Sequence, residues 1–393
     1  MDRALTRRKA GVVVSLAGAA ALTLLTGSLS SAGASTAKAS APSLTSLEKT
    51  LTSVESSAPA GASLQETGSS LFFPLFQVWS SQYSPAKITP VSSGSGTGQS
   101  QAETGTVDIG ASDAYLPPGA PGGVINIPVV VSAQDVFYNL LGVKAHLRLN
   151  PTILQEMYKG TITNWDDPAI KKINPGVPLP NLAVVPIHRS DSSGDTFLFT
   201  SYLDFGLGGS PANPLGGSSF VASGGGPNTG FTAWPNVPGA LSAKGNSGMQ
   251  ALCIATPGCI AYIGISYLRG ALKGHLGYAE LQNGKGNYIL PTPGATGSIA
   301  AEVASFKNIP SSGALSLIWS LSSKTGFPIV NFEYAVVKQA PSSATQAAAI
   351  KAMLAWGMDP RHGAQTSTLV PFNFQPLAPN AMAVAVQLLQ SVS

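Results

Sequence analysis

The sequence predicts an α/β protein with two lobes, and three observations support this fold class. The chain has 393 residues, which is more than a single small core needs. Short apolar runs typical of buried strands alternate with longer stretches of helical spacing, which is the pattern of sheets flanked by helices. Only 10% of the residues are charged, while Gly (43) and Pro (30) are abundant, so the chain is globular with many ordered turns.

Residues 1–34 have the three parts of a secretory signal peptide: a basic start, an apolar run and small residues at 32–34. We expect export to the cell envelope, the periplasm or the extracellular space, with cleavage after Ala34. The pair Arg7 and Arg8 leaves the twin-arginine route open beside the general secretory route, and an uncleaved segment would form a short membrane anchor. Both cysteines lie far from this segment, so we expect no lipoprotein anchor.

Residues 35–62 are rich in Ser, Ala and Thr and predict a flexible leader, with the folded body starting at residue 63. The signal carries four basic residues and one acidic residue, so the rest of the chain has a net charge of only about +1. Proteins that bind nucleic acid normally present a basic face. The charge balance therefore argues against nucleic acid as a partner.

Apolar runs in the folded body predict strands, and periodic stretches predict helices. Strands are expected at 124–131, 182–187 and 260–265, and helices at 72–83, 196–203, 343–356 and 380–389. The Gly-rich stretch 206–230 predicts a long surface loop.

Two strands are candidates for connections between the lobes. One strand-rich block ends near Tyr138, and a comparable strand spans 327–337. If both cross between the lobes, lobe I consists of 63–137 plus 331–393, and lobe II of 138–330.

Cys253 and Cys259 are the two cysteines of the chain, and the turn-forming pair Pro257 and Gly258 lies between them. In an oxidising compartment we expect them to form a disulfide that closes this short loop. Two buried free thiols are the alternative.

Three segments place Gly, Ser or Thr directly before a helical pattern: 67–71, 94–98 and 190–195. A helix N-terminus offers unpaired N–H groups and a positive dipole end, so each segment is a candidate anion cradle. Taken singly, each is more typical of ordinary N-capping. Three of them in one exported chain, with Arg189 directly ahead of the third, favour an oxyanion site.

Asp113 follows an apolar strand and places a carboxylate among these segments. Monohydrogen phosphate carries an O–H donor and sulfate carries none, so a buried carboxylate accepts a hydrogen bond from the first and repels the second. Asp113 as the cap of a strand-end turn is the alternative interpretation.

The chain carries a series of motifs in a fixed order. They are Gly68-Ser69-Ser70-Leu71 with Pro74 and Trp79, Gly94-Ser95-Gly96, and the stretches 105–113, 164–167, 189–197, 199–203, 244–248 and 257–262. Together they resemble the substrate-binding proteins of high-affinity phosphate ABC transporters. In order and spacing the match covers essentially everything after residue 62.

The resemblance implies a type II periplasmic-binding-protein fold, in which each lobe is a mixed sheet flanked by helices and two strands form the hinge. It implies phosphate as the ligand, between the lobes, and the permease subunits of an ABC transporter as partners. Asp191 would brace the guanidinium of Arg189, and Gly94 would support the loop before Ser95. The implied ligand contacts are Ser70, the Leu71 N–H, Ser95, Asp113, Arg189, Ser193, the Gly194 N–H and Asp195.

Two positions depart from the family pattern. Many members have Phe where Leu71 stands, which is harmless if only the main-chain N–H is used. Many have Thr where Asp195 stands, so a second carboxylate either enters the site and accepts a further ligand proton, or caps the helix at its edge.

We expect a monomeric phosphate carrier without enzymatic activity, cofactor or metal. An exported phosphatase or other hydrolase is the rival from another class, but the sequence has no Gly-x-Ser-x-Gly or His-Glu-x-x-His pattern, and its four histidines lack metal-ligand spacing. Arsenate as the ligand of the same fold, and a surface antigen without a transport role, remain further alternatives.

Overall fold

The computed structural model describes residues 43–208, 237–318 and 322–393. The predicted signal at 1–34 and most of the Gly-rich stretch 206–230 lie outside these ranges. No helix in the described ranges is long and apolar enough to cross a membrane.

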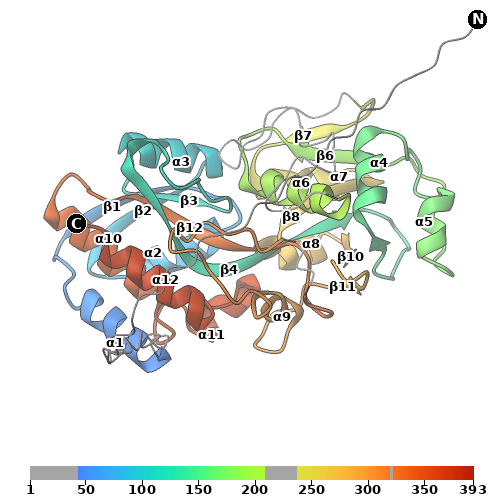
Figure 1. The fold of residues 1–393 in the computed structure, drawn as a ribbon. Helices are drawn as coiled ribbons and strands as arrows, with labels where there is room; N and C mark the ends of the chain where they lie inside the picture. Colours follow the sequence, from blue (N-terminus) through green and yellow to red (C-terminus); the bar gives the residue numbers. More distant parts are fainter. Residues whose placement is uncertain (1–42, 209–236, 319–321) are drawn as a thin grey trace, which may run out of the picture. The chain divides into compact units, whose positions relative to one another are not determined.

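Within the described residues, nine strands form one mixed sheet in the order β2-β1-β3-β12-β4-β8-β6-β7, with β9 paired to β4 (Figure 1). A smaller sheet has the order β11-β10-β5. The strands are β1 (Ala62–Gly68), β2 (Ala86–Ser92), β3 (Ile109–Ser112), β4 (Val124–Tyr138), β5 (Arg148–Leu149), β6 (Val185–Arg189), β7 (Leu241–Ala243), β8 (Cys259–Gly264), β9 (Gly277–Tyr278), β10 (Glu280–Gln282), β11 (Tyr288–Ile289) and β12 (Val330–Lys338).

Strand β4 joins the two halves of the large sheet. Its residues 124–133 pair antiparallel with β12, and its residues 134–138 pair antiparallel with β8. On the far side of β12, the strands β1, β2 and β3 are parallel to one another, and on the far side of β4 the same holds for β8, β6 and β7. Each half is therefore a mixed sheet.

Helices pack against both halves of the sheet (Figure 1). They are α1 (Leu44–Glu55), α2 (Phe73–Gln82), α3 (Ser95–Thr104), α4 (Pro151–Lys159), α5 (Pro168–Ile173), α6 (Gly194–Gly206), α7 (Gly245–Ala255), α8 (Leu268–Lys273), α9 (Ser298–Val303), α10 (Ala344–Met358), α11 (Thr366–Leu369) and α12 (Pro379–Gln390), with short 3-10 turns at Pro121–Gly123, Ile265–Tyr267 and Val370–Phe372. Helices α2, α3, α10 and α12 contact the half that contains β1, and α6 and α7 contact the half that contains β6.

An aromatic cluster anchors α2. Phe72, Phe76 and Trp79 recur on one face at helical spacing and are fully buried, with ring centroids 5.2–5.8 Å apart. The Trp79 indole donates to the Gly363 carbonyl at 2.9 Å. This packing fixes the start of α2, and with it the turn formed by residues 69–72.

The α/β class predicted from the sequence is confirmed, and the four expected helices are α2, α6, α10 and α12. Strand β6 starts at Val185 rather than at 182. Residues 182 and 184 pair instead with the 163–165 segment, where Trp165 N–H donates to the Leu182 carbonyl and Val184 N–H to the Thr163 carbonyl, both at 2.9 Å.

The prediction of a flexible leader over 35–62 is wrong for residues 44–55, because helix α1 occupies Leu44–Glu55. Ser43 caps this helix, and Leu47 and Leu51, four residues apart, are buried. The helix packs on α10 and α12. Although the surrounding composition is that of a linker, two leucines at helical spacing are enough to stabilise a helix when they pack on a neighbouring surface.

The structure bonds Cys253, in α7, to Cys259, at the start of β8, with Cα atoms 5.4 Å apart. Gly258 makes the intervening turn with a φ of 79°, and a Cβ there would lie 2.2 Å from the Ala183 carbonyl oxygen. Only glycine fits this turn.

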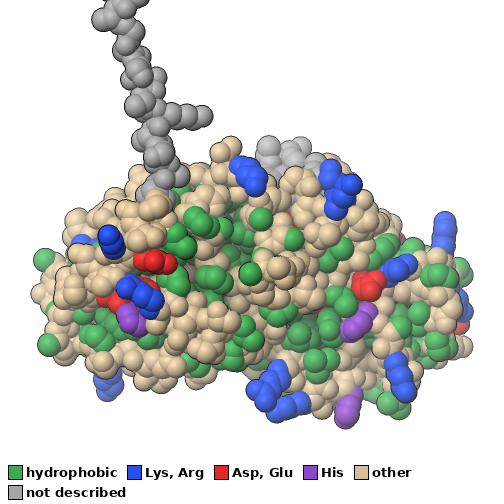
Figure 2. All heavy atoms as spheres, turned by 90° about the horizontal axis from the view of Figure 1, so that it is seen from below, with side chains coloured by type: hydrophobic (Ala, Val, Ile, Leu, Met, Phe, Trp, Pro, Cys, Tyr) green, Lys and Arg blue, Asp and Glu red, His purple; other side chains and the backbone are tan. Residues whose placement is uncertain are grey.

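The face drawn in Figure 2 shows Lys and Arg side chains at separate points among neutral and apolar surface, rather than gathered in one basic area. The face therefore has no concentrated positive field of the kind that attracts polyanions.

Candidate anion-binding site

The turn after β1 brings a serine to Asp113. Gly68 has a φ of 146°, and a Cβ there would lie 1.9 Å from the Ala111 carbonyl oxygen, so the chain can turn here only with glycine. The next residue, Ser69, accepts a hydrogen bond from Phe72 N–H at 3.0 Å and donates to an oxygen of the Asp113 carboxylate. Ser69 was not among the predicted contacts.

Ser70 lies in the same turn, is 1% exposed, and faces a different partner. Its hydroxyl oxygen accepts hydrogen bonds from the main-chain N–H of Asn246 at 3.0 Å and from its side-chain amide at 2.9 Å. Leu71 is fully buried, and its carbonyl accepts from the Ser266 hydroxyl at 2.8 Å. The turn thus connects the two halves of the molecule, since Asn246 belongs to α7.

Asp113 lies just past β3 and is only 2% exposed. Ser95, the first residue of α3, donates its hydroxyl to Asp113 Oδ2 at 3.0 Å. Gly94 precedes it with a φ of 98°, and a Cβ there would lie 2.6 Å from Asp191 Oδ2. The start of α3 is therefore pressed against the segment that follows β6.

Arg189 ends β6 with its side chain 1% exposed and held by two carboxylates. Asp191 accepts from Nε at 2.7 Å and from Nη2 at 2.5 Å, which is a bidentate brace of the kind that the family resemblance implied. Burial opposes the ionisation of Asp191, but the hydrogen bonds and charge of Arg189 outweigh it and lower the Asp191 pKa. Asp195 accepts from Nη1 at 2.6 Å.

Asp195 is fully buried and is not the cap of α6. Ser193 is the cap, because its hydroxyl accepts from Thr196 N–H at 3.3 Å. The Asp195 carboxylate also accepts from Asn246 Nδ2 at 2.7 Å and from Gln134 Nε2 at 3.0 Å. Burial, followed by the charge of Asp113, raises the pKa of Asp195 to about 7.

Gly194 places the start of α6 against Asp113. A Cβ on Gly194 would lie 2.6 Å from Asp113 Oδ2 and 2.7 Å from the Ser95 hydroxyl oxygen. The turn before α2 and the starts of α3, α6 and α7 thus converge on buried carboxylates. Their hydroxyls, main-chain N–H groups and dipoles are suited to an anion that also carries protons.

The family model of the PBP superfamily domain matches residues 53–361. The phosphate-binding protein PstS of Methanocaldococcus jannaschii is 30% identical over 357 residues, covering 82% of this chain and 86% of that protein. PstS of Xylella fastidiosa (strain 9a5c) is 28% identical over 319 residues, covering 80% and 81%. The chain belongs to the PstS family of phosphate-binding proteins.

A solved structure described as a high-affinity periplasmic phosphate-binding protein (PfluDING) bound with phosphate has a TM-score of 0.61 to this chain. The two are 19% identical, and the match covers 82% of this chain and 92% of the other. With the family model, this likeness assigns the two sheet halves to the two lobes of a periplasmic-binding-protein fold. Both the fold and the family that the sequence resemblance implied are confirmed.

Sequence reasoning missed four polar residues that the PstS-family fold brings to this region: Ser69, Gln134, Asn246 and Glu333. Ser69 stands beside the predicted Ser70, so only the geometry of the turn decides between them. Asn246 lies in a fourth Gly/Ser-rich helix start, 244–248, to which no role was given. Gln134 and Glu333 lie inside apolar strands, where the pattern marks core rather than site.

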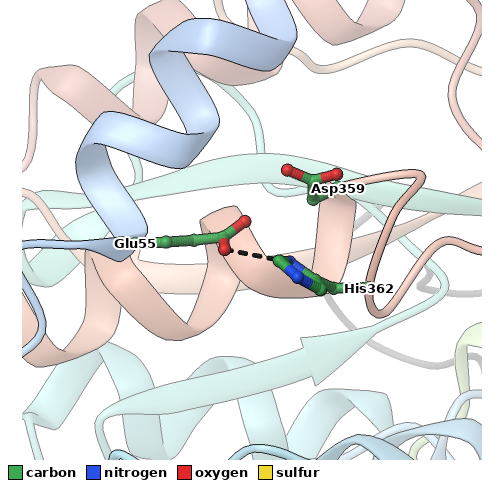
Figure 3. A group of neighbouring side chains, drawn as sticks. All are labelled: Glu55, Asp359 and His362. Carbon is green, nitrogen blue, oxygen red and sulfur yellow. Dashed lines mark ion pairs between the residues drawn. The ribbon is translucent and has the colours of Figure 1, made fainter.

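One group outside this site, Glu55, Asp359 and His362, has the residue types of a metal site and is the sole group of three such residues found in the described ranges (Figure 3). His362 Nδ1 lies 3.0 Å from Glu55 Oε2. Arg361, however, already binds both oxygens of Asp359, with Nε 2.9 Å from Oδ1. Because a guanidinium balances this carboxylate, we assign the group a structural role in holding α1 to the end of α10.

Proposed function

We propose that this chain binds inorganic phosphate between its two lobes and delivers it to the membrane subunits of an ABC importer. The observation that carries the proposal is Asp113, a buried carboxylate that receives hydroxyl donors from Ser69 and Ser95 and faces the N-terminus of α6 at Gly194. Such a carboxylate favours an anion that still carries an O–H group.

The proposed contacts come from both lobes. Lobe I consists of residues 63–137 plus 331–393, and lobe II of residues 138–330. Lobe I would contribute Ser70, the Leu71 N–H, Ser95 and Asp113. Lobe II would contribute Arg189, Ser193, the Gly194 N–H and Asp195.

Arg189 would supply one positive charge to the site. The two carboxylates bonded to its guanidinium partly neutralise that charge, so the ligand would interact with less than a full positive charge. Selection would therefore rest on matching hydrogen-bond donors and acceptors, since a dehydrated anion needs nearly complete hydrogen bonding to offset the loss of water. The close approach of Gly94 to Asp191 and of Gly194 to Asp113 supports hinged lobes that close on the ligand.

The protein is proposed to act outside the cytoplasm as a monomeric carrier and not as an enzyme. The similarity to PstS proteins and the Cys253–Cys259 bond support this, since disulfides persist in oxidising compartments. His188, the histidine beside Arg189, has its Nδ1 3.1 Å from the Arg189 carbonyl oxygen. That contact engages the ring with the backbone of β6.

Calorimetric titration of residues 35–393 with phosphate and with sulfate tests the proposal. Phosphate should bind far more tightly than sulfate. Asp113→Asn should narrow this preference by about tenfold or more, because the variant no longer repels a fully ionised anion. Absence of phosphate binding, or equal binding of both anions by the unaltered protein, would refute it.

A further inference from the structure

Glu333 is a fully buried carboxyl on β12, the strand that pairs with both β3 and β4. In the antiparallel pair of β12 with β3, Tyr334 lies opposite Ser112. Continuing this register by one residue brings Glu333 opposite Asp113, on the same face of the sheet. The proposed phosphate-selecting carboxylate therefore has a second carboxyl as its neighbour.

The two oxygens of Glu333 have different surroundings. Oε1 accepts from the Ser132 hydroxyl at 2.5 Å and from the Asn331 amide at 3.2 Å. No N–H or O–H group in the described part of the chain donates to the buried Oε2. An oxygen with no donor beside it, facing another carboxylate, is the position where a carboxylic acid carries its proton.

Charge decides which of the two carboxyls is neutral. Asp113 receives hydroxyl hydrogens from Ser69 and Ser95 on its two oxygens, which stabilises its ionised form. Burial, followed by the charge of Asp113, raises the pKa of Glu333 well above its ordinary value. The other charged or titratable groups that act on this pair are Asp195, near Asp113, with its partner Arg189, and Tyr334, with Tyr115 beside it.

We propose that Glu333 is a protonated positioning residue, which donates a hydrogen bond to the Asp113 carboxylate and so keeps Asp113 ionised and oriented toward the O–H group of the ligand. The inference rests on the proposed function. With Glu333 protonated, the Asp113–Glu333 pair places one negative charge, rather than two, beside the bound anion. Through Ser132 of β4, Glu333 also connects Asp113 to both strands that pair along the joint between the lobes.

Two variants of similar size separate the roles of this side chain. Glu333→Gln keeps an N–H donor for Asp113 and an acceptor for Ser132 but cannot ionise, whereas Glu333→Met removes both. Phosphate affinity is measured by calorimetry from pH 6 to pH 9. At pH 7 the Gln variant should stay close to the unaltered protein, and the Met variant should lose about tenfold to a hundredfold, the cost of a lost hydrogen bond to a charged group.

As pH rises, the Gln variant should keep its affinity at least as well as the unaltered protein, because only the latter can form two adjacent carboxylates. Tyr138→Phe is the matched control: it removes a buried hydroxyl from the last residue of β4, one that is bonded to the Ala145 carbonyl at 3.0 Å, and should leave affinity unchanged. A Met variant that binds like the unaltered protein, or a Gln variant as weak as the Met variant, would overturn the inference.

Infrared spectroscopy gives a readout that does not depend on ligand binding or on whether the Met variant folds. Other buried carboxyls, such as Asp195 and Glu55, contribute to the neutral carboxylic-acid band in both proteins. At pH 7 the difference spectrum should show that Glu333→Gln lacks one component of this band, and an identical spectrum in both would overturn the inference. If the band is present and phosphate does not bind, the proposed function fails while the protonated pair stands.

Discussion

The hydroxyl oxygen of Ser70 accepts two hydrogen bonds from Asn246, one from its main-chain N–H at 3.0 Å and one from its side-chain amide at 2.9 Å. The same amide donates to Asp195 at 2.7 Å, and the Asn246 oxygen accepts from Gly264 N–H at 2.7 Å. Asn246 therefore joins the turn before α2, the start of α6 and the end of β8.

Asn246→Ala should weaken phosphate binding by about tenfold, because it removes the donor shared by Ser70 and Asp195 and leaves both buried with fewer partners. Asn283→Ala is a suitable control, since Asn283 is also buried but donates to the Lys324 and Gly326 carbonyls. Calorimetry on both variants checks this. Equal losses in the two would show that the effect is a general one on the fold.

Gly194→Ala should hold the lobes apart. The new Cβ would lie 2.6 Å from Asp113 Oδ2, closer than real Cβ contacts allow, while the helical backbone at this position suits alanine. We expect phosphate affinity to fall about tenfold or more without loss of folding stability.

Small-angle scattering with phosphate should show that the Gly194→Ala variant stays more extended than the unaltered protein. Gly248→Ala, in α7, is the control because its Cβ would meet only Ala243, whose Cβ would lie at an ordinary 3.4 Å. If both variants close on phosphate alike, the contact between Gly194 and Asp113 does not form on closure.

Asp195 should make phosphate binding depend on pH. Its pKa of about 7 means that it is largely neutral at pH 6 and ionised at pH 8, so a negative charge appears beside the ligand as pH rises. The affinity of the unaltered protein, relative to Asp195→Asn, should fall between these two pH values by about tenfold. Asp195→Thr should behave like the Asn variant, and a constant ratio across the range would show that Asp195 does not titrate during binding.

Glu55 should lower the stability of the protein as pH rises. Burial, followed by the charge of Asp359, raises the pKa of Glu55 from 4.5 to about 7. Such a group is protonated when folded and ionised when unfolded at intermediate pH, so the free energy of unfolding falls from about pH 4.5 to pH 7. Despite burial, hydrogen bonds from Arg361 lower the pKa of Asp359, which keeps its charge.

Thermal melts at pH 5 and pH 8 measure this effect of Glu55. Between pH 5 and pH 8, the melting temperature of Glu55→Gln should fall by roughly 2 °C less than that of the unaltered protein. Lys49→Gln, at an exposed position of the same helix, should change nothing. A Glu55→Gln variant whose melts shift with pH as much as those of the unaltered protein would contradict the assignment.

Much of the fold follows from local patterns. The alternation of apolar strands with periodic helices predicts the class, and the positions of α2, α6, α10 and α12 follow from hydrophobic spacing over ten or more residues. The brace of Arg189 by Asp191 is also local, because two residues separate the partners. The wrong prediction at α1 has a non-local cause. Its few leucines stabilise a helix because they pack on α10 and α12, and composition alone cannot predict such packing.

By itself, the sequence determined the fold class, the Gly/Ser-rich helix starts and the presence of Asp113 and Arg189 among them, because capping, turns and helix dipoles depend on residues close together in the chain. The tertiary structure alone decided that Ser69 rather than Ser70 bonds Asp113, that Gln134 reaches Asp195, and that the register of β12 with β3 brings Glu333 opposite Asp113. These partners lie on different strands and helices, so their contact depends on sheet order and register, which no local spacing encodes.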